Sequence, residues 1–304
     1  EGNDTFNAPL DLAIDGLVGA QTLQGSDVLN GGGGVNTLNA ELNGTGTTAN
    51  PTISNIQIYN LTSYAGLLGF GNGELDLDRA TGYEQLWNRN SRVDLELYNV
   101  GEVAILGMDN VRDGSTYEVN YDNIAVETQV VVANQSGAAG NRVELEINGV
   151  LGGDITTLEL IVSNGVYLRL DNDAADMDNL IISGSGVLDL VGEDNFEFLQ
   201  TLDSTMYDGD LDLDVSGSDI LTSVMTGPGD DRVVVSNAAV DGDLEVDMGA
   251  GANTLAITGV VEPVDFDNLD FTGGVVNVQT LEFVDGFGWF GAFANETPVL
   301  DLDE

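Results

Sequence analysis

Hydrophobic and polar residues alternate one by one along much of this chain. The pattern is clearest in Val143–Ile147, Leu211–Val215 and Leu244–Met248, where single acidic residues separate the apolar ones. A period of two is typical of β-strands with one buried and one solvated face. Disordered acidic segments instead carry blocks of like charge and few branched aliphatic residues. The alternation therefore predicts a folded, β-rich chain.

Strand-like segments recur along the chain and are separated by Gly, Asn, Asp and Ser. From residue 126 onward we predict strands over Val126–Ala133, Val143–Ile147, Leu158–Val162, Tyr167–Leu170, Leu180–Ile182, Val187–Val191, Phe196–Leu202, Leu211–Val215, Arg232–Val235, Leu244–Met248, Thr254–Thr258, Leu269–Thr272 and Val275–Phe283. Short, evenly spaced strands are typical of a sandwich, a barrel or a stacked solenoid. Corners rich in Gly, Asn and Asp favour the solenoid, because these residues tolerate tight turns. We expect an all-β, right-handed parallel β-solenoid or β-roll-like fold of elongated form.

The first third of the chain is less regular. We expect a β-rich region over residues 1–125, with short irregular or helical insertions such as a helical turn at Tyr83–Trp87. Residues 126–304 would form the solenoid and end in an aromatic segment, and one continuous domain is the alternative. Four arginines, Arg79, Arg89, Arg92 and Arg112, lie within 34 residues. They would either pair with nearby acids or form a basic patch that docks on an acidic neighbouring subunit.

The charge is almost entirely negative, with 52 Asp and Glu against seven basic residues and a net charge of −45. All seven basic residues are Arg, and the chain has no Lys, His or Cys. Nucleic acid is excluded as a partner, because phosphate binding requires clustered Lys and Arg. Membrane insertion is not expected, because no run of about twenty apolar residues is present. The absence of Cys is compatible with export to an oxidising exterior.

Glycine-rich loops carry the candidate chemistry. Gly31–Asn39 fits the pattern Gly-Gly-x-Gly-x-Asp-x-apolar-x, with Asn36 in the place of Asp. Gly25–Asn30 repeats the second half of this pattern nine residues earlier, and Gly2–Asn7 is another half copy. Two further copies, 22 residues apart, are Gly227–Val233 and Gly249–Leu255.

This pattern of residues suits calcium. Glycine allows positive φ and aims backbone carbonyls inward, and Asp adds a carboxylate. Because Ca²⁺ takes about six to eight oxygens, two stacked turns would complete one cage. The alternative is that the motifs are simple turns. The predicted ligands are Asp4, Gly25, Asp27, Gly32, Gly34, Asn36, Gly229, Asp230, Asp231, Gly251 and Asn253.

A second candidate is the acidic stretch that contains Asp171 and Asp173, followed by Asp176 and Asp178. It resembles a short calcium loop but lacks the Gly and the closing Glu of an EF-hand. A solvated acidic turn is the alternative interpretation.

The glycine-rich loops resemble the repeats-in-toxin calcium-binding β-roll. The wider chain is similar to calcium-dependent surface-layer (S-layer) proteins and related β-roll exoproteins of Gram-negative bacteria. The resemblance implies export by type I secretion with an uncleaved C-terminal signal. The chain departs from the pattern because its loops are isolated and because Asn36 and Asn253 replace Asp, which keeps an oxygen ligand but removes its charge.

These observations favour a structural protein over an enzyme. General bases and nucleophiles such as His, Lys and Cys are absent, and acid pairs such as Asp212 and Asp214 match the solvated face of a strand. We expect a secreted, calcium-stabilised protein that self-assembles at the cell surface or outside the cell as a surface-layer or filament subunit. Cell-surface polysaccharide is a further candidate partner. The alternatives are a module of a larger adhesin and a polysaccharide-active β-helix enzyme, since paired acids can hydrolyse glycosides. The aromatic segment Phe283–Phe293 would cap the solenoid, dock a partner or belong to the secretion signal.

Overall fold

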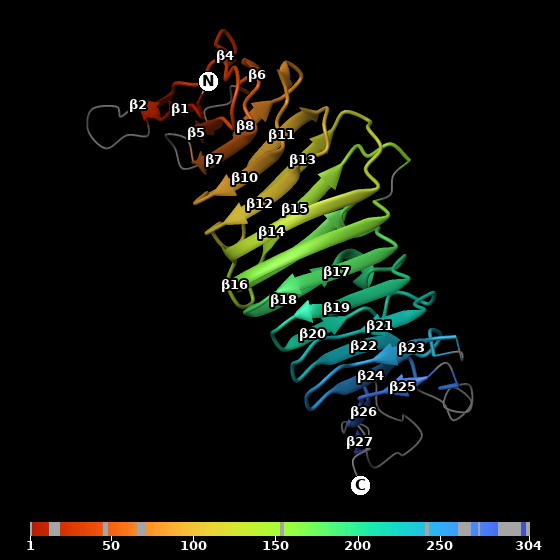
Figure 1. Cartoon of the computed structure of the whole chain (residues 1–304). Helices are drawn as coiled ribbons and strands as arrows, with labels where there is room; N and C mark the ends of the chain where they lie inside the picture. The colour runs from red at the N-terminus through yellow and green to blue at the C-terminus, as the bar shows by residue number, and fades with distance from the viewer. Residues whose placement is uncertain are drawn as a thin grey trace. The chain divides into compact units, whose positions relative to one another are not determined.

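The structure is a computed structural model that describes residues 2–11, 19–44, 48–65, 71–152, 155–240, 243–260, 269–272, 274–284 and 299–301. These residues form a parallel β-solenoid (Figure 1). In the described residues, the helical structure is a single 3₁₀ turn, η1 (Glu193–Asn195). The predicted all-β parallel solenoid is therefore confirmed.

The chain divides into two compact units. Unit 1 contains Glu1–Ile155 and Gly165–Ala174, and unit 2 contains Thr156–Asn164 and Ala175–Glu304. The long strand β16 (Thr157–Asn172) contributes its second half to unit 1 and its first half to unit 2.

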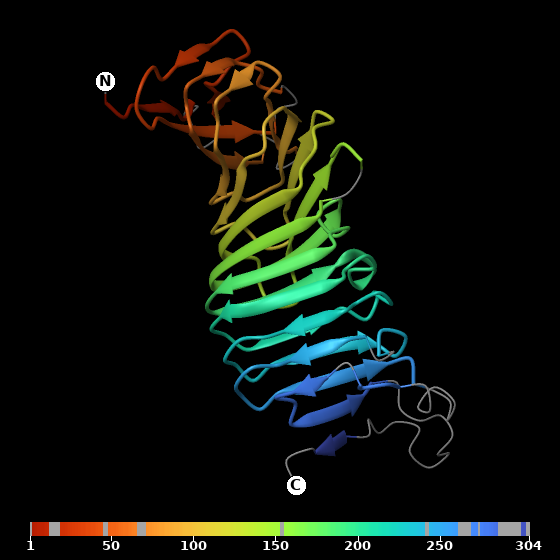
Figure 2. The ribbon, with the colours of Figure 1, turned by 45° about the vertical axis from the view of Figure 1, so that its right-hand side comes forward.

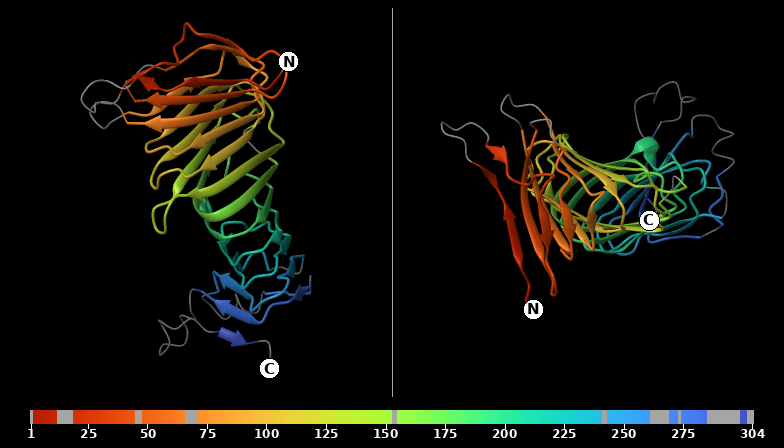
Figure 3. Two further views of the ribbon diagram at one scale, coloured as in Figure 1. Left: turned by 60° about the vertical axis from the view of Figure 1, so that its left-hand side comes forward. Right: turned by 90° about the horizontal axis from the view of Figure 1, so that it is seen from above.

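Unit 1 is built from rows of parallel strands, in which each strand pairs with the equivalent strand of the next coil (Figure 3, left). Row 1 contains β1 (Thr5–Ala8), β5 (Thr37–Asn43), β7 (Ile58–Tyr64), β10 (Gln85–Arg89), β12 (Ile105–Asp109) and β14 (Thr128–Ser136). Row 2 contains β8 (Gly73–Asp76), β11 (Leu95–Val100), β13 (Thr116–Tyr121), β15 (Val143–Asn148) and the second half of β16. A shorter row contains β4 (Val28–Asn30), β6 (Thr52–Ser54) and β9 (Ala80–Thr81), and β2 (Leu10–Asp11) pairs with β3 (Ala20–Gln21) in antiparallel orientation.

Unit 2 repeats this plan with shorter strands (Figure 2). Row 3 contains the first half of β16, β17 (Asn179–Gly184), β19 (Thr201–Tyr207), β21 (Ser223–Met225), β23 (Glu245–Asp247) and β25 (Val275–Val276). Row 4 contains β18 (Val187–Gly192), β20 (Leu211–Asp214), β22 (Arg232–Ser236), β24 (Thr254–Thr258) and β26 (Thr280–Phe283). The last strand, β27 (Val299–Asp301), lies antiparallel to β26.

Columns of apolar side chains fill the interior of the coils. In row 1, Leu38, Tyr59, Leu86, Leu106 and Val131 are aligned by the strand register, and each is 0% exposed. Burying one such side chain contributes about 1.5–3 kcal/mol. The alternation in the sequence is thus the alternation between these inward positions and the outward polar ones.

Asparagines occupy many of the corners between strands. Asn90 and Asn110 both have φ of 54°, in the left-handed region that Asn tolerates better than most residues. The Nδ2 of Asn110 donates to the Oδ1 of Asn90 at 2.7 Å, so equivalent corners of successive coils are linked. Further asparagines with positive φ are Asn55, Asn99, Asn123, Asn164, Asn172, Asn195 and Asn277.

The helical turn predicted at Tyr83–Trp87 is wrong, because residues Gln85–Arg89 form strand β10. Leu86 and Asn88 point into the coil and are fully buried, whereas Trp87 lies on the outer face and is half-buried. This is the in-and-out alternation of a strand. An Asn at an inward position concealed the period of two.

Three predicted strands of unit 2 also differ from the structure, and one of them, Val275–Phe283, is divided into β25 and β26. Phe196 follows the turn η1 with a φ of 63° and a fully buried ring, and strand β19 begins only at Thr201. Phe196 is therefore a core plug at a corner instead of a strand residue. Leu269–Thr272 forms no strand of its own among the described residues.

Candidate functional site

The glycine-rich turns of unit 2 are stacked on one another. A Cβ atom on Gly229 would lie 2.5 Å from the carbonyl oxygen of Gly209, and one on Gly251 would lie 1.8 Å from the carbonyl oxygen of Gly229. No side chain fits at these separations. The glycines therefore bring turn carbonyls of successive coils close together, as the sequence pattern predicts.

The residue that ends each of these turns points into the coil. Asp231 is 2% exposed and Asn253 is 0% exposed. The Oδ1 of Asn253 accepts from the backbone N–H of Asp231 at 3.0 Å, and the Oδ1 of Asp231 accepts from that of Leu211 at 2.9 Å. The backbone N–H of Asn253 in turn donates to the Oε1 of Gln279 at 2.7 Å. We call this series of side chain-to-backbone hydrogen bonds a ladder. Asp231, Asn253 and the half-buried Gln279 can all take part in it, because each side chain offers an acceptor oxygen.

The second oxygen of Asp231 distinguishes it from Asn253. The Nδ2 of Asn253 donates to the carbonyl oxygens of Met248 at 2.6 Å and Asn277 at 3.0 Å. The Oδ2 of Asp231 is buried and has no hydrogen-bond partner among the described residues. Burial is the main cause that raises the pKa of the Asp231 carboxyl. The nearby Thr226 hydroxyl and the Leu211 backbone N–H act in the opposite direction, and the charge of Asp210 adds to the rise. A proton or a bound cation would relieve this buried charge.

Asp230 lies on the outside of the same turn and is exposed. Its Oδ1 accepts from the backbone N–H of Ala252 at 2.8 Å, and its own backbone N–H donates to the Oδ1 of Asp210 at 2.9 Å. The exposed acids thus link the three turns that contain Asp210, Asp230 and Ala252.

The N-terminal copies of the motif form a similar ladder in unit 1. Asn36 is fully buried, and its Oδ1 accepts from the backbone N–H of Asp4 at 2.8 Å. A Cβ atom on Gly34, which has a φ of +94°, would lie 2.5 Å from the carbonyl oxygen of Gly2. The motif copies at Gly2–Asn7 and Gly31–Asn39 are therefore neighbours in space. The side chain of Asp4 is exposed, and Gly32 lies in the turn with a φ of +69°.

Gly25 and Asp27 belong to a different turn. The Oδ2 of Asp27 accepts from the backbone N–H of Gln24 at 2.9 Å, within that turn. The carbonyl oxygen of Gly25 accepts from Arg79, which also donates to the carbonyl oxygen of Asn50, each at 3.1 Å. The Gly25 carbonyl, which we predicted to bind calcium, therefore accepts a hydrogen bond from the guanidinium group of Arg79 instead.

Asp171 lies near the end of strand β16, whereas Asp173, Asp176 and Asp178 follow in the loop between β16 and β17. The Oδ2 of Asp171 is 3.1 Å from the Nη2 of Arg169. The Oδ2 of Asp173 accepts from the backbone N–H of Val150 at 3.1 Å. Among the described residues, no group of three or more Asp, Glu, His or Cys side chains is arranged to hold one metal ion.

A row of stacked carboxylates lies on the outer face of row 2. The strand register aligns Glu74, Glu96, Glu118, Glu146 and Asp171 on five successive strands. We call this set the carboxylate row. The sequence shows an acid in each strand, but the register that stacks them comes from the structure.

Charge repulsion and amide hydrogen bonds act against each other in this row. Strands about 4.8 Å apart place neighbouring charges where they repel by roughly 1 kcal/mol in water and about 3 kcal/mol at an effective dielectric constant near 20. The Nδ2 of Asn120 donates to Glu118 at 2.9 Å, and that of Asn148 donates to Glu146 at 3.1 Å. Burial, with smaller contributions from Glu146 and Glu96, nevertheless raises the pKa of Glu118. The row would be stabilised by cations.

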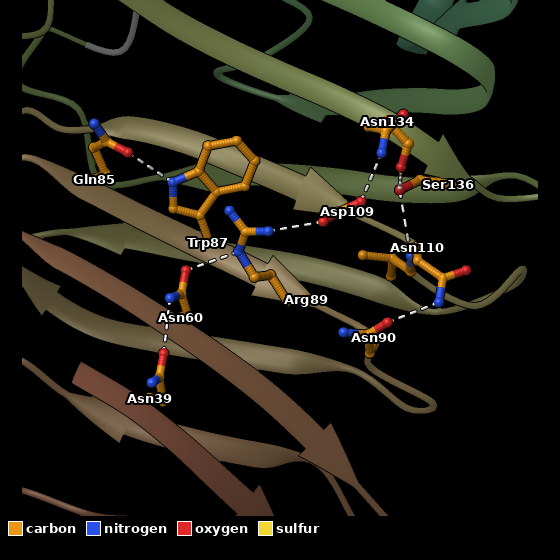
Figure 4. A network of polar contacts seen from close by, with 11 residues as sticks. Asn39, Asn60, Gln85, Trp87, Arg89, Asn90, Asp109, Asn110, Asn134 and Ser136 are labelled. Carbon is orange, nitrogen blue, oxygen red and sulfur yellow. Dashed lines mark hydrogen bonds and ion pairs between the residues drawn. The ribbon is translucent and has the colours of Figure 1, made fainter. Parts of the chain in front are cut away.

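Row 1 carries a different outer face, a network of amides and one arginine (Figure 4). The Nδ2 of Asn39 donates to Asn7 at 2.9 Å, and the Nδ2 of Asn60 donates to Asn39 at 2.8 Å. Arg89 donates to the Oδ1 of Asn60 at 2.7 Å and to the Oδ2 of Asp109 at 2.7 Å. The network therefore crosses strands β1, β5, β7, β10 and β12.

Trp87 lies within this face. A Cβ atom on Gly107 would lie 2.1 Å from the indole ring, so the ring covers that glycine on the next strand. The guanidinium carbon of Arg89 is 4.2 Å from the ring centroid, a cation–π contact. This face was not predicted from the sequence, because its only signal is polar and aromatic residues at outward positions of strands in the less regular first third of the chain.

Comparison of the chain with protein-family models, with curated proteins and with solved structures finds no match. The β-solenoid fold expected from the resemblance to β-roll exoproteins is present, and the family remains a hypothesis. Within the part of the chain that the structure describes, no helix has the length and apolar character needed to cross a membrane.

Proposed function

We propose that the chain is a secreted, calcium-stabilised structural protein that assembles with copies of itself at the cell surface, as a surface-layer or filament subunit. The observation that supports calcium binding is the carboxylate of Asp231, which is 2% exposed and has one oxygen without a hydrogen-bond partner among the described residues. The carboxylate row supports it, because its stacked charges also favour a bound cation.

The donors around Asp231 fit calcium by type. Ca²⁺ prefers carboxylate and carbonyl oxygens, and the turns supply the carbonyls of Gly209 and Gly229. The buried Oδ2 of Asp231 would supply a charged ligand. Because only the folded coils bring these groups together, calcium binding would add to the free energy of unfolding, by about 2.7 kcal/mol at a hundredfold excess over Kd.

Thermal unfolding with and without calcium tests this proposal. We expect a chelator to lower the melting temperature and calcium to restore it, whereas magnesium restores it poorly because it prefers a small octahedral site. The test variant is Asp231→Asn, which removes the charged ligand and should reduce the rise in melting temperature that calcium causes. Equal melting curves with and without chelator would refute the calcium part.

Self-assembly is tested separately by electron microscopy of the calcium-treated protein. Ordered arrays or fibres support a structural subunit, and monodisperse particles indicate instead a module of a larger adhesin. The aromatic residues Phe287, Trp289, Phe290 and Phe293 lie outside the described residues, and Phe283 is buried in β26. Deletion of residues 285–304 therefore asks whether the aromatic segment drives assembly. Turnover of a polysaccharide by the purified chain would contradict a non-enzymatic role.

A further inference from the structure

Two of the seven arginines have no side-chain partner among the residues that the structure describes. Arg79, Arg89, Arg169 and Arg232 each contact an acceptor or an acid, and Arg142 also takes part in an interaction. Across the described residues, the guanidinium groups of Arg92 and Arg112 make no ion pair or hydrogen bond, and both side chains are exposed. The chain carries 52 acids, so these two cations stand out as free to bind an external anion.

The two arginines occupy equivalent positions of successive coils. The backbone N–H of Arg112 donates to the carbonyl oxygen of Ser91 at 3.0 Å, and that of Arg92 donates to Ser63 at 3.0 Å. Each arginine follows a corner asparagine by two residues, and these asparagines are the hydrogen-bonded pair Asn90 and Asn110 (Figure 4). The backbones are therefore about one strand spacing apart, about 4.8 Å. Two like charges so placed repel each other, and a ligand with negative charge would remove this repulsion.

A hollow of about 500 Å³ lies beside these side chains. Its lining includes Arg92, Arg112, the amides of Asn90, Asn110 and Gln135, and the half-exposed ring of Tyr64. One carboxylate, Asp113, also lines it and accepts from the Nδ2 of Asn141 at 2.7 Å. Two guanidinium groups against one carboxylate leave the hollow with a positive charge, in contrast to the rest of the surface.

A second hollow of about 330 Å³ shares Asn90 with the first, and its lining includes Asn7, Asn39, Asn60, Arg89 and one carboxylate, Glu41, which accepts from the backbone N–H of Leu10 at 2.8 Å. Each amide has two N–H donors and two acceptor lone pairs. The bonds that link Asn39 and Asn60 to their neighbours use one N–H of each, which leaves the other for a ligand. The two hollows extend over the six strands of row 1, about 24 Å at one strand spacing per step.

From this arrangement we propose that the outer face of row 1 binds an acidic polysaccharide. Ligand carboxylates would pair with Arg92 and Arg112, and ligand hydroxyls would bond to the amides of Asn39, Asn60 and Asn90. A row of amides suits sugar hydroxyls better than it suits the carboxylates of a second copy of this chain, which need cationic partners. A polymer also matches the length of the two joined hollows. This site is independent of the proposed calcium binding and self-assembly.

Calorimetric titration with a tetragalacturonate tests the site, in calcium-containing buffer at 0.15 M salt, where long-range repulsion is screened beyond about 8 Å. The test variant is Arg92→Gln with Arg112→Gln. The matched control is Arg169→Gln with Arg232→Gln, which loses the same charge at residues far from the hollows in sequence. We expect affinity at least tenfold weaker in the test variant, equivalent to about 1.4 kcal/mol, and little change in the control. Lys at both positions should restore part of the affinity, and the methyl-esterified tetramer should bind the wild type weakly.

Three results would overturn the proposal. They are no binding by the wild type, equal loss in the test and control variants, and equal binding of the charged and esterified tetramers. Sedimentation measurements on the same variants test the other candidate partner, a second copy of this chain. A wild-type dimer that dissociates in the test variant, without any binding of the tetramer, would identify a second copy as the partner and refute the polysaccharide. Because calcium is constant throughout, a failure of the calcium proposal would leave this comparison interpretable.

Discussion

Replacing Asp231 by Asn should stabilise the chain when calcium is absent. Asn keeps the Oδ1 that accepts from the Leu211 N–H and replaces the unpartnered charged oxygen by an N–H donor. The equivalent residue Asn253 shows where that donor points, because its Nδ2 binds the carbonyl of Met248, five residues earlier. For Asn at position 231 the corresponding carbonyl belongs to Thr226.

The magnitude follows from the unpaired oxygen. Leaving a buried polar group without a partner costs about 1–3 kcal/mol, and more when the group is charged. At about 2–4 °C per kcal/mol for a domain of roughly this size, Asp231→Asn should raise the melting temperature by about 2–12 °C in the presence of a chelator. The reverse substitution, Asn253→Asp, should lower it by a similar amount, because its new oxygen would face the Met248 carbonyl.

The dependence on pH has a definite sign. Burial raises the pKa of Asp231 in the folded chain above the ordinary value of 3.8. The folded state then binds the proton more tightly than the unfolded state, so stability falls as pH rises through the folded pKa and is regained on acidification. The difference in melting temperature between wild type and Asp231→Asn should therefore shrink as pH is lowered from 7 toward 4.

Melting curves of the two substitutions, recorded by circular dichroism at several pH values with chelator present, provide the assay. If Asp231→Asn and Asn253→Asp shift the melting temperature in the same direction, or if neither shift depends on pH, the assignment of a costly buried charge at Asp231 is wrong.

Three further substitutions test other parts of the structure. Asn88→Leu should raise the free energy of unfolding in urea by about 1–3 kcal/mol. The reason is that both polar atoms of this buried amide lack partners among the described residues. A loss of stability would contradict this prediction. Gly107→Ala should displace the ring of Trp87 and shift its fluorescence toward that of an exposed indole, with a loss of about 1–3 kcal/mol; unchanged emission would show that the ring does not need this contact. Glu118→Gln should raise the melting temperature at low salt and lose that advantage near 1 M salt, where charges are screened beyond about 3 Å; an effect independent of salt would argue against repulsion in the carboxylate row.

The sequence was sufficient to predict the fold where acids mark the outer face. In Val143–Ile147 and Leu211–Val215 every second residue is apolar, and both are strands of the solenoid. In β10 an inward Asn88 and an outward Trp87 reverse the expected polarity, so the pattern pointed to a helical turn. Tertiary packing, which no local pattern encodes, decides such positions.

The candidate sites were predictable only in part, for a related reason. The glycine pattern located the stacked turns, because they depend on local backbone geometry, but it did not predict that the Asp231 side chain points into the coil. The carboxylate row and the pair Arg92 and Arg112 depend instead on which residues stack across coils. Successive coils differ in length, since Leu38 aligns with Tyr59 and Tyr59 with Leu86. A fixed repeat therefore could not give the register.

The stacking of strands in rows also implies that single coils can unfold locally, without unfolding of the whole chain. Because each strand bonds to the equivalent strand of the adjacent coil, the free energy needed to expose an amide depends mainly on the interfaces of its own coil. The coil that contains Asp231 carries an uncompensated charge and should open more readily than the coils around it. Backbone amides of β22 should then exchange with solvent faster than those of the neighbouring strands. Binding of a cation or a proton to the Asp231 carboxylate should remove this difference.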